Sequence, residues 1–154
     1  GLVLINTLRK PSERLNWINN AMANAVKFGG TQLILDMTLP MVASPKFLSK
    51  MRENALKYEN YLGLDDYNGV SKLMHGGLKT SWNFDWSKLD LPVLIMTGHH
   101  DKVFRIEEDI NDLIKKIHNV RRIEIPECGH LIPLEDPKLF SYHLNGFIGS
   151  LKKQ

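Results

Sequence analysis

The chain has 154 residues, of which 43% are apolar and 24% are charged, and its formal net charge is +3. This composition favours a folded core over disorder. The positive charges are scattered along the sequence, which argues against a nucleic-acid-binding surface. Its one cysteine, Cys128, excludes an internal disulfide and suits a reducing compartment, so we expect a cytoplasmic protein. No apolar run approaches the roughly 20 residues that span a bilayer, and the opening residues lack the segments of a signal peptide, so no membrane partner is expected.

Residues 1–8 begin with five residues that carry none of the charge, proline or bulge with which edge strands usually avoid pairing. We therefore predict an interior strand that has a neighbour on each side. No earlier segment of the sequence could supply the second neighbour. We expect the chain to be a fragment that lacks the N-terminal half of its fold.

Helical patterns follow over residues 9–88. The first helix is predicted to begin after Ser12 and to end at the glycine pair 29–30. A second, very apolar helix is predicted from Thr31, with an interruption at Pro40.

Two more helices are predicted in this region. Ser44, followed by a proline, is expected to cap a helix that ends at Gly63, and Asp65 to cap a shorter one that stops at the glycine pair 76–77. The helices could form a lid over an apolar pocket or an ordinary helical core, and the sequence leaves both readings open.

The second half of the chain has the pattern of an α/β protein. Residues 91–98 form a nearly continuous apolar run, which is typical of a strand buried on both faces. An amphipathic helix over residues 105–118 and a strand over residues 120–125 complete a βαβ unit, which implies parallel strands. A final helix is predicted from Asp136 onward.

Asp101 and His130 each follow one of these two strands. The carboxyl ends of parallel strands meet at one edge of a sheet, with neighbouring strands about 5 Å apart, so the two side chains can reach each other. A carboxylate on Nδ1–H fixes the imidazole tautomer and leaves the other nitrogen free to act as a base. The alternative is a surface histidine beside an unrelated aspartate.

Other candidates in these loops are less favoured. His99 and His100, with Asp101 and His130, could suggest a metal site, but consecutive loop residues rarely point the same way. Cys128 could be a thiol nucleophile, although a small buried residue is the favoured interpretation. Glu135 and Asp136 are expected to cap the last helix rather than to take part in catalysis.

Two motifs carry a family resemblance. Leu-Pro-Val-Leu-Ile-Met-Thr-Gly-x-x-Asp-Lys-Val, followed by Ile-Pro-Glu-Cys-Gly-His-Leu-Ile-Pro-Leu-Glu-Asp-Pro, resembles the α/β-hydrolase superfamily, in particular its capped esterase and C–C hydrolase branch. The resemblance implies that Asp101 is the acid and His130 the general base of a catalytic triad. It also implies that residues 1–8 and 89–154 are the C-terminal part of the hydrolase core and residues 9–88 the cap. No cofactor is implied.

The sequence departs from this family at the nucleophile. Gly-x-Ser-x-Gly, the motif that carries the family's serine, is absent, and the nearest approach, around Ser71, lacks the closing glycine and a preceding strand. The family's oxyanion-hole groups also lie in the half that is not present. We therefore expect this chain to be inactive by itself.

The resemblance implies hydrolysis of a small carboxylic ester, or of a related acyl or C–C bond, by a serine outside this chain. Val103, Phe104 and Leu131 flank the two loops and either line the acyl pocket or pack in the core. An aspartate nucleophile, as in epoxide hydrolases and dehalogenases, would use the same acid and base. The rival interpretation is a non-catalytic module whose edge at residues 1–8 pairs with the missing half or with a second copy in a homodimer.

Overall fold

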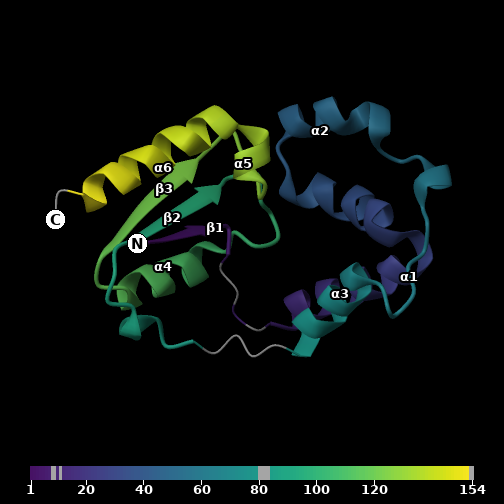
Figure 1. Ribbon diagram of the computed structural model, residues 1–154, viewed down its shortest axis with the longest axis horizontal. Helices are drawn as coiled ribbons and strands as arrows, with labels where there is room; N and C mark the ends of the chain where they lie inside the picture. The colour runs from purple at the N-terminus through teal and green to yellow at the C-terminus, as the bar shows by residue number, and fades with distance from the viewer. Residues whose placement is uncertain (8–9, 11, 80–83, 153–154) are drawn as a thin grey trace. The chain divides into compact units, whose positions relative to one another are not determined.

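A computed structural model describes residues 1–7, 10, 12–79 and 84–152 (Figure 1). The chain divides into two compact units. A sheet unit comprises Gly1–Arg9, Met41–Phe47 and Phe84–Gln154, and a helical unit comprises Lys10–Pro40 and Leu48–Asn83. Residues 8, 9 and 11, where the predicted insertion begins, lie outside the described residues.

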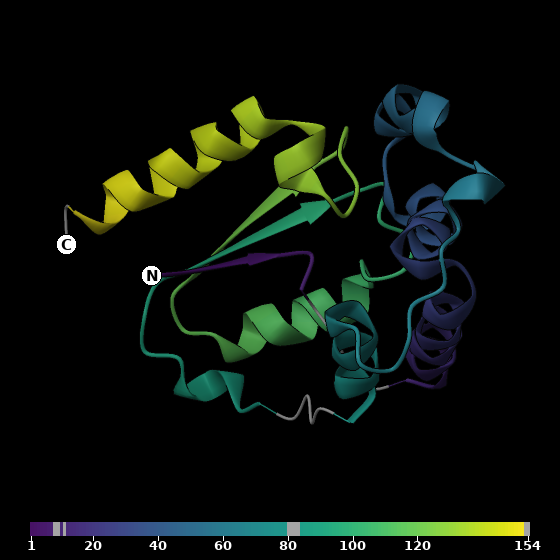
Figure 2. The same ribbon diagram turned by 45° about the vertical axis from the view of Figure 1, so that its right-hand side comes forward.

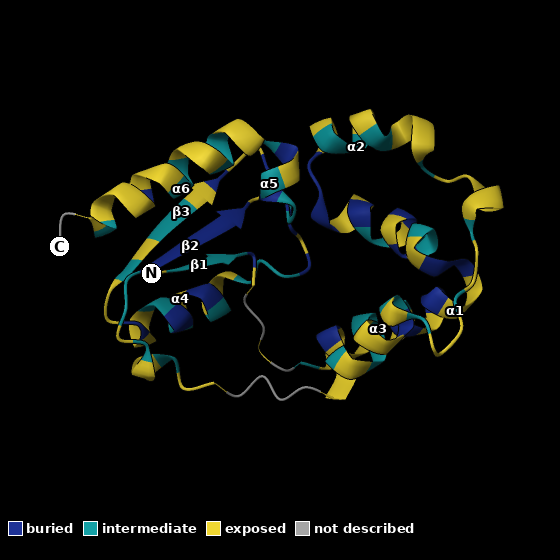
Figure 3. Ribbon diagram, in the orientation of Figure 1, coloured by how far each residue is buried: buried dark blue, intermediate teal, exposed yellow. Residues whose placement is uncertain are grey.

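The sheet unit contains three parallel strands in the order β1 (Leu2–Ile5), β2 (Val93–Gly98) and β3 (Val120–Ile125). All six residues of β2 are buried, as the uninterrupted apolar run requires (Figure 3). The predicted α/β fold class is confirmed. In the described part of the chain β1 pairs with β2 alone, so its expected second neighbour stays a prediction.

Helices cover both faces of this sheet (Figures 1 and 2). On one face, α4 (Glu107–Lys116) packs against Val93 and Ile95, and on the other, α6 (Pro137–Leu151) packs against Leu94 and Met96. Successive side chains of a strand point to opposite faces, so one apolar strand supplies both core layers.

Short helical elements surround the sheet. The four-residue α5 (Ile132–Glu135) precedes α6, and a 3₁₀ turn, η3 (Trp86–Lys88), precedes β2. Asp136 caps α6 by accepting the N–H of Leu139, as predicted for this residue.

Most of α1 (Glu13–Val42) lies in the helical unit, and the helix contains a break at Gly30. Gly30 has a φ of 59°, and a Cβ there would overlap the carbonyl oxygen of Leu62. The predicted stop at the glycine pair is thus a kink between two helical segments. The predicted interruption at Pro40 is wrong, because a proline in the last turn removes little helical bonding before the helix ends at Val42.

The helix predicted from Ser44 to Gly63 is much shorter than expected. Ser44 does accept the N–H of Phe47 at the start of α2 (Pro45–Met51), but two 3₁₀ turns, η1 (Arg52–Asn54) and η2 (Tyr58–Asn60), follow. Asp36 of α1 accepts the N–H of Leu56 and the hydroxyl of Tyr61, and these bonds hold the segment in an irregular path.

The last helix of this unit, α3 (Gly69–Lys79), starts later and ends later than predicted. Asp65 accepts the N–H groups of Tyr67 and Asn68 and forms a turn before the helix. The glycine pair 76–77 lies inside α3, because neither glycine has the positive φ of a helix-ending residue. Within the described ranges, no helix has both the length and the apolar character needed to cross a membrane.

Candidate active site

Asp101 lies three residues after the end of β2, and its side chain is completely buried. Its Oδ1 accepts the backbone N–H of Val103 at 3.1 Å and that of Phe104 at 2.8 Å. Its Oδ2 lies 2.6 Å from Nδ1 of His130. One oxygen thus fixes the turn after the strand, while the other faces the histidine.

His130 follows β3 in the loop that leads into α5, and 30% of its side chain is exposed. A carboxylate only accepts hydrogen bonds, so the short contact assigns the ring proton to Nδ1. Nε2 then carries the lone pair. The ring of Phe104 lies beside the imidazole, with 4.7 Å between the ring centroids.

Glu135 has a role that the sequence analysis did not foresee. Its buried carboxylate accepts the N–H groups of Ser44, Gly129 and Leu131 at 2.9, 2.9 and 3.1 Å. The expectation that it caps the last helix is wrong, because its side chain turns back toward the histidine loop. One signal in the sequence could have indicated this role: Glu135 is an acidic residue at the end of an apolar stretch, five positions after His130.

Asn6 was also missed. It directly follows β1, is buried, and has a φ of 47°. Its Nδ2 donates to the carbonyls of Gly129 and His130 at 3.0 and 2.9 Å, and its Oδ1 accepts the N–H of Gly98 at 3.0 Å. One amide therefore connects the ends of all three strands. A polar residue ending an apolar strand was the only hint in the sequence.

The end of α1 contacts both loops. The carbonyl of Met41 accepts the N–H of Lys102, and that of Val42 accepts the N–H of His130 at 2.6 Å. These carbonyls belong to the last turn of the helix, where no intrahelical donor remains for them. Met41 and Val42 belong to the sheet unit, so these bonds tie residues 41–47 to the loops that carry Asp101 and His130 within that unit.

Gly98 and Gly129 allow this close packing. A Cβ on Gly98 would overlap the carbonyl oxygen of Gly129, and a Cβ on Gly129 would overlap that of Val42. Neither glycine has a positive φ. These positions therefore require glycine for space between neighbouring backbones rather than for an unusual turn.

The three residues predicted to line an acyl pocket differ in their exposure. Val103 is buried, whereas Phe104 and Leu131 are half-buried beside the histidine. Phe104 contacts the imidazole through its ring, and the N–H of Leu131 is held by Glu135.

The competing candidates do not join this cluster. Nε2 of His99 lies 3.3 Å from a carboxylate oxygen of Glu124 in an exposed pair, and the described residues contain no group of three side chains arranged to hold a metal. Cys128 is buried, and burial raises the pKa of its thiol to about 11, which keeps it in the less nucleophilic protonated form. Ser71 is buried in α3, where its hydroxyl has no hydrogen-bond partner among the residues described.

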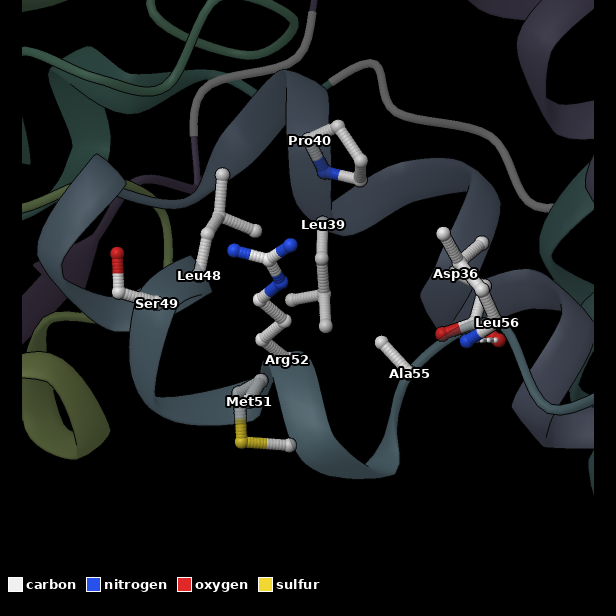
Figure 4. Close-up of a pocket in the computed structure, with 9 residues that line it drawn as sticks. All are labelled: Asp36, Leu39, Pro40, Leu48, Ser49, Met51, Arg52, Ala55 and Leu56. Carbon is white, nitrogen blue, oxygen red and sulfur yellow. Dashed lines mark hydrogen bonds between the residues drawn. The ribbon is translucent and has the colours of Figure 1, made fainter.

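The helical unit contains a pocket of its own, with a volume of about 320 Å³ (Figure 4). Its lining is mostly apolar and comes from the end of α1, from α2 and from the turn that follows, including Leu39, Leu48 and Leu56. The guanidinium of Arg52 extends across it between Leu48 and Leu39. Its size lies at the lower end of the range for small-molecule sites.

Known proteins resemble this chain. No family model matches it. A curated relative from Bacillus subtilis (strain 168), which carries the provisional name 2-succinyl-6-hydroxy-2,4-cyclohexadiene-1-carboxylate synthase, is 29% identical over 119 residues, covering 73% of this chain and 41% of the relative.

Solved structures match along nearly the whole chain. A thermophilic esterase from Thermogutta terrifontis is 20% identical with a TM-score of 0.75, covering 97% of this chain and 56% of the esterase. An α/β-hydrolase enzyme from a Medee basin deep-sea metagenome library is 21% identical with a TM-score of 0.67, covering 96% of this chain and 55% of that enzyme. The chain spans about half the length of these proteins. The strand order, the flanking helices and these matches together show that the chain has the α/β-hydrolase fold.

Proposed function

We propose that this chain supplies the acid and the base of a hydrolase that cleaves a small carboxylic ester or a related acyl or C–C bond. The 2.6 Å contact between Asp101 and His130 is the observation that carries the proposal. A buried carboxylate against a partly exposed imidazole, at the carboxyl edge of a parallel sheet, is an arrangement that suits general-base catalysis.

In the proposed mechanism a serine hydroxyl from outside this chain attacks the substrate carbonyl. Nε2 of His130 takes the hydroxyl proton as the new C–O bond forms, and Asp101 stabilises the resulting imidazolium through Nδ1–H. The imidazolium then gives this proton to the leaving alcohol, and the acyl group remains on the serine. A water molecule, deprotonated by Nε2 of His130, then attacks the acyl-serine. The carboxylic acid product leaves as the serine oxygen regains a proton from the imidazolium.

The proposed substrate-binding residues are Val103, Phe104 and Leu131, of which Phe104 and Leu131 retain accessible surface. We propose residues 9–88 as the cap and residues 1–8 with 89–154 as part of the core. The mostly apolar pocket of the helical unit supports a cap that receives an apolar group. The relative named as an esterase favours an ester as substrate.

By itself the chain is proposed to have negligible activity. An acid and a base without a nucleophile and oxyanion hole contribute little, because these elements act as a unit. The sequence contains no Gly-x-Ser-x-Gly motif, and the hydroxyl of Ser71 is buried in a helix. The one cysteine, Cys128, favours a reducing compartment such as the cytoplasm as its location.

A second candidate function is pairing through the free side of β1. Leu2–Ile5 is apolar, and in the described residues it pairs on one side only. An added parallel strand, from the other half of a hydrolase or from a second copy, would satisfy its unused backbone groups. This function requires no catalysis, so turnover that depends on His130, once a nucleophile is supplied from another chain, would distinguish the first candidate from it.

The test is a chimera in which this chain replaces the matching part of the Thermogutta terrifontis esterase, which retains its own nucleophile. We expect a folded chimera to hydrolyse p-nitrophenyl esters and to lose this activity on His130→Ala. A fluorophosphonate should label the nucleophilic serine of the esterase part, and this labelling should weaken in His130→Ala because the base that activates the serine is lost. Turnover of the chimera that persists unchanged in His130→Ala would refute the proposed role of His130. Ester hydrolysis assays of the chain by itself test the proposal that it is inactive alone.

A further inference from the structure

The backbone around His130 is held by several hydrogen bonds, of which one runs from the N–H of His130 itself to the carbonyl of Val42. The N–H groups of Gly129 and Leu131, on either side of the histidine, donate to Glu135. The carbonyls of Gly129 and His130 accept from Asn6. We infer that Asn6 and Glu135 are positioning residues for His130, which together hold its loop so that Nδ1 stays within hydrogen-bonding distance of Asp101. This inference rests on the proposed function only in taking His130 as the base.

Asn6 requires an amide for this role. It donates to two carbonyls and at the same time accepts the N–H of Gly98, so a carboxylate would lose the donors and a methyl group would lose both functions. Its φ of 47° favours asparagine, aspartate or glycine over other residues. Asn6→Asp therefore keeps the size and the backbone preference while removing the donation.

Glu135 requires a carboxylate. All of its partners are backbone donors, from Ser44, Gly129 and Leu131, and its two oxygens share them. A glutamine would turn an NH₂ group toward at least one of these N–H groups, which would then be buried without an acceptor. Glu135→Gln thus changes the hydrogen bonds with almost no change in volume.

The two residues hold the loop from two different elements. Asn6 comes from the end of β1, more than 120 positions before the histidine, and Glu135 from α5 directly after it. Because acid–base catalysis tolerates displacements of only about 0.5 Å, a loop released from either element should lose the alignment of the imidazole.

The first measurement uses the chain itself and needs no turnover. In protein labelled with ¹⁵N-histidine, the Nδ1 proton of His130 should give a resonance far downfield of the amides, assigned by its loss in Asp101→Asn. We expect this resonance to be lost or broadened in Asn6→Asp and in Glu135→Gln. Only variants that remain folded, as judged by dispersed methyl signals from the sheet core, are compared. If Asn6→Asp unfolds, Asn6→Gly replaces it, because glycine also tolerates a positive φ.

Matched variants control for charge. Asp136→Asn removes a neighbouring carboxylate but preserves a good helix cap, and Asn20→Asp introduces the same change as Asn6→Asp on an exposed helix position. Both controls should retain the resonance. An unchanged Nδ1–H resonance in folded Asn6 and Glu135 variants would overturn the inference.

The second measurement uses the esterase chimera. Asn6→Asp and Glu135→Gln should lower kcat by about 10²-fold, the cost of a small misplacement, and leave KM within about twofold because neither residue contacts substrate. A rise in KM at unchanged kcat would contradict a positioning role. If the chimera shows no turnover that depends on His130, the proposed function fails, whereas the resonance of Nδ1–H still decides whether the two residues position the histidine.

Discussion

Oδ2 of Asp101 lies 2.6 Å from Nδ1 of His130, while Oδ1 of the same carboxylate holds the turn after β2. Asp101→Asn keeps an oxygen for the turn and presents NH₂ to the imidazole, which forces the proton onto Nε2. We expect kcat of the esterase chimera to fall by about 10⁴-fold, as for the same substitution in serine proteases. The tautomer is measured by ¹⁵N chemical shifts of the histidine, with the exposed Asp90→Asn as control. A ring that keeps its proton on Nδ1 would contradict this expectation.

Two glycines should respond to alanine with opposite signs. Gly129→Ala places a Cβ on the carbonyl of Val42 in a buried loop, so we expect the free energy of unfolding to fall by about 1–3 kcal/mol. Gly146→Ala lies on the exposed face of α6 with open space around the Cβ, so we expect a gain of about 0.5–1 kcal/mol from helix propensity. Urea unfolding measures both. Equal effects at the two sites would show that the close contact at Gly129 is relieved without cost.

The thiol of Cys128 should be unreactive in the folded protein. Burial, with smaller contributions from Glu135, Asp136 and Glu127, raises its pKa from 9.0 to about 11. A group with a raised pKa stabilises the fold fully below its unfolded pKa, and this contribution is lost as the pH rises from about 9 through about 11. We expect slow modification by DTNB at pH 8, and fast modification after denaturation. Cys128→Ala should weaken the alkaline loss of stability, and rapid labelling of the native thiol would contradict its burial.

Tyr61 reports on the bonds of Asp36 in the helical unit. Desolvation raises the pKa of Tyr61, and the hydrogen bond to Asp36 and the negative charge of that residue raise it further. Asp36→Asn should therefore lower the pKa of Tyr61 only part of the way, since desolvation remains. Ultraviolet titration of the phenolate measures this, and Tyr61→Phe identifies the transition among the four tyrosines. Stability associated with the raised pKa is present at neutral pH and is lost as Tyr61 ionises.

The sheet and the meeting of Asp101 with His130 could be anticipated because they depend on local signals. The apolar run of β2, the amphipathic α4 and the strand β3 follow one another closely, and the topology then brings the two strand ends together. The helix boundaries of the helical unit were harder to predict. They depend on contacts between distant residues, such as the bond between Asp36 and Leu56, which the helix propensities of single residues do not reveal.

Asn6 and Glu135 could not be assigned for the same physical reason. Both side chains bind backbone N–H or C=O groups. Nearly every residue type carries these groups, so the residue types at the partner positions do not indicate the contact. Asn6 contacts a loop more than 120 residues away. Glu135 is near His130 in sequence, but a glutamate before a helix fits a cap equally well until the direction of its side chain is known.

The carbonyls of Met41 and Val42 have a consequence for protein engineering. They accept the amides of Lys102 and His130, so a shortened version that joins residue 7 directly to residue 84 would strip both amides of their acceptors. Any minimal scaffold built from this sheet must keep residues 41–47 or provide substitute acceptors at the same two points.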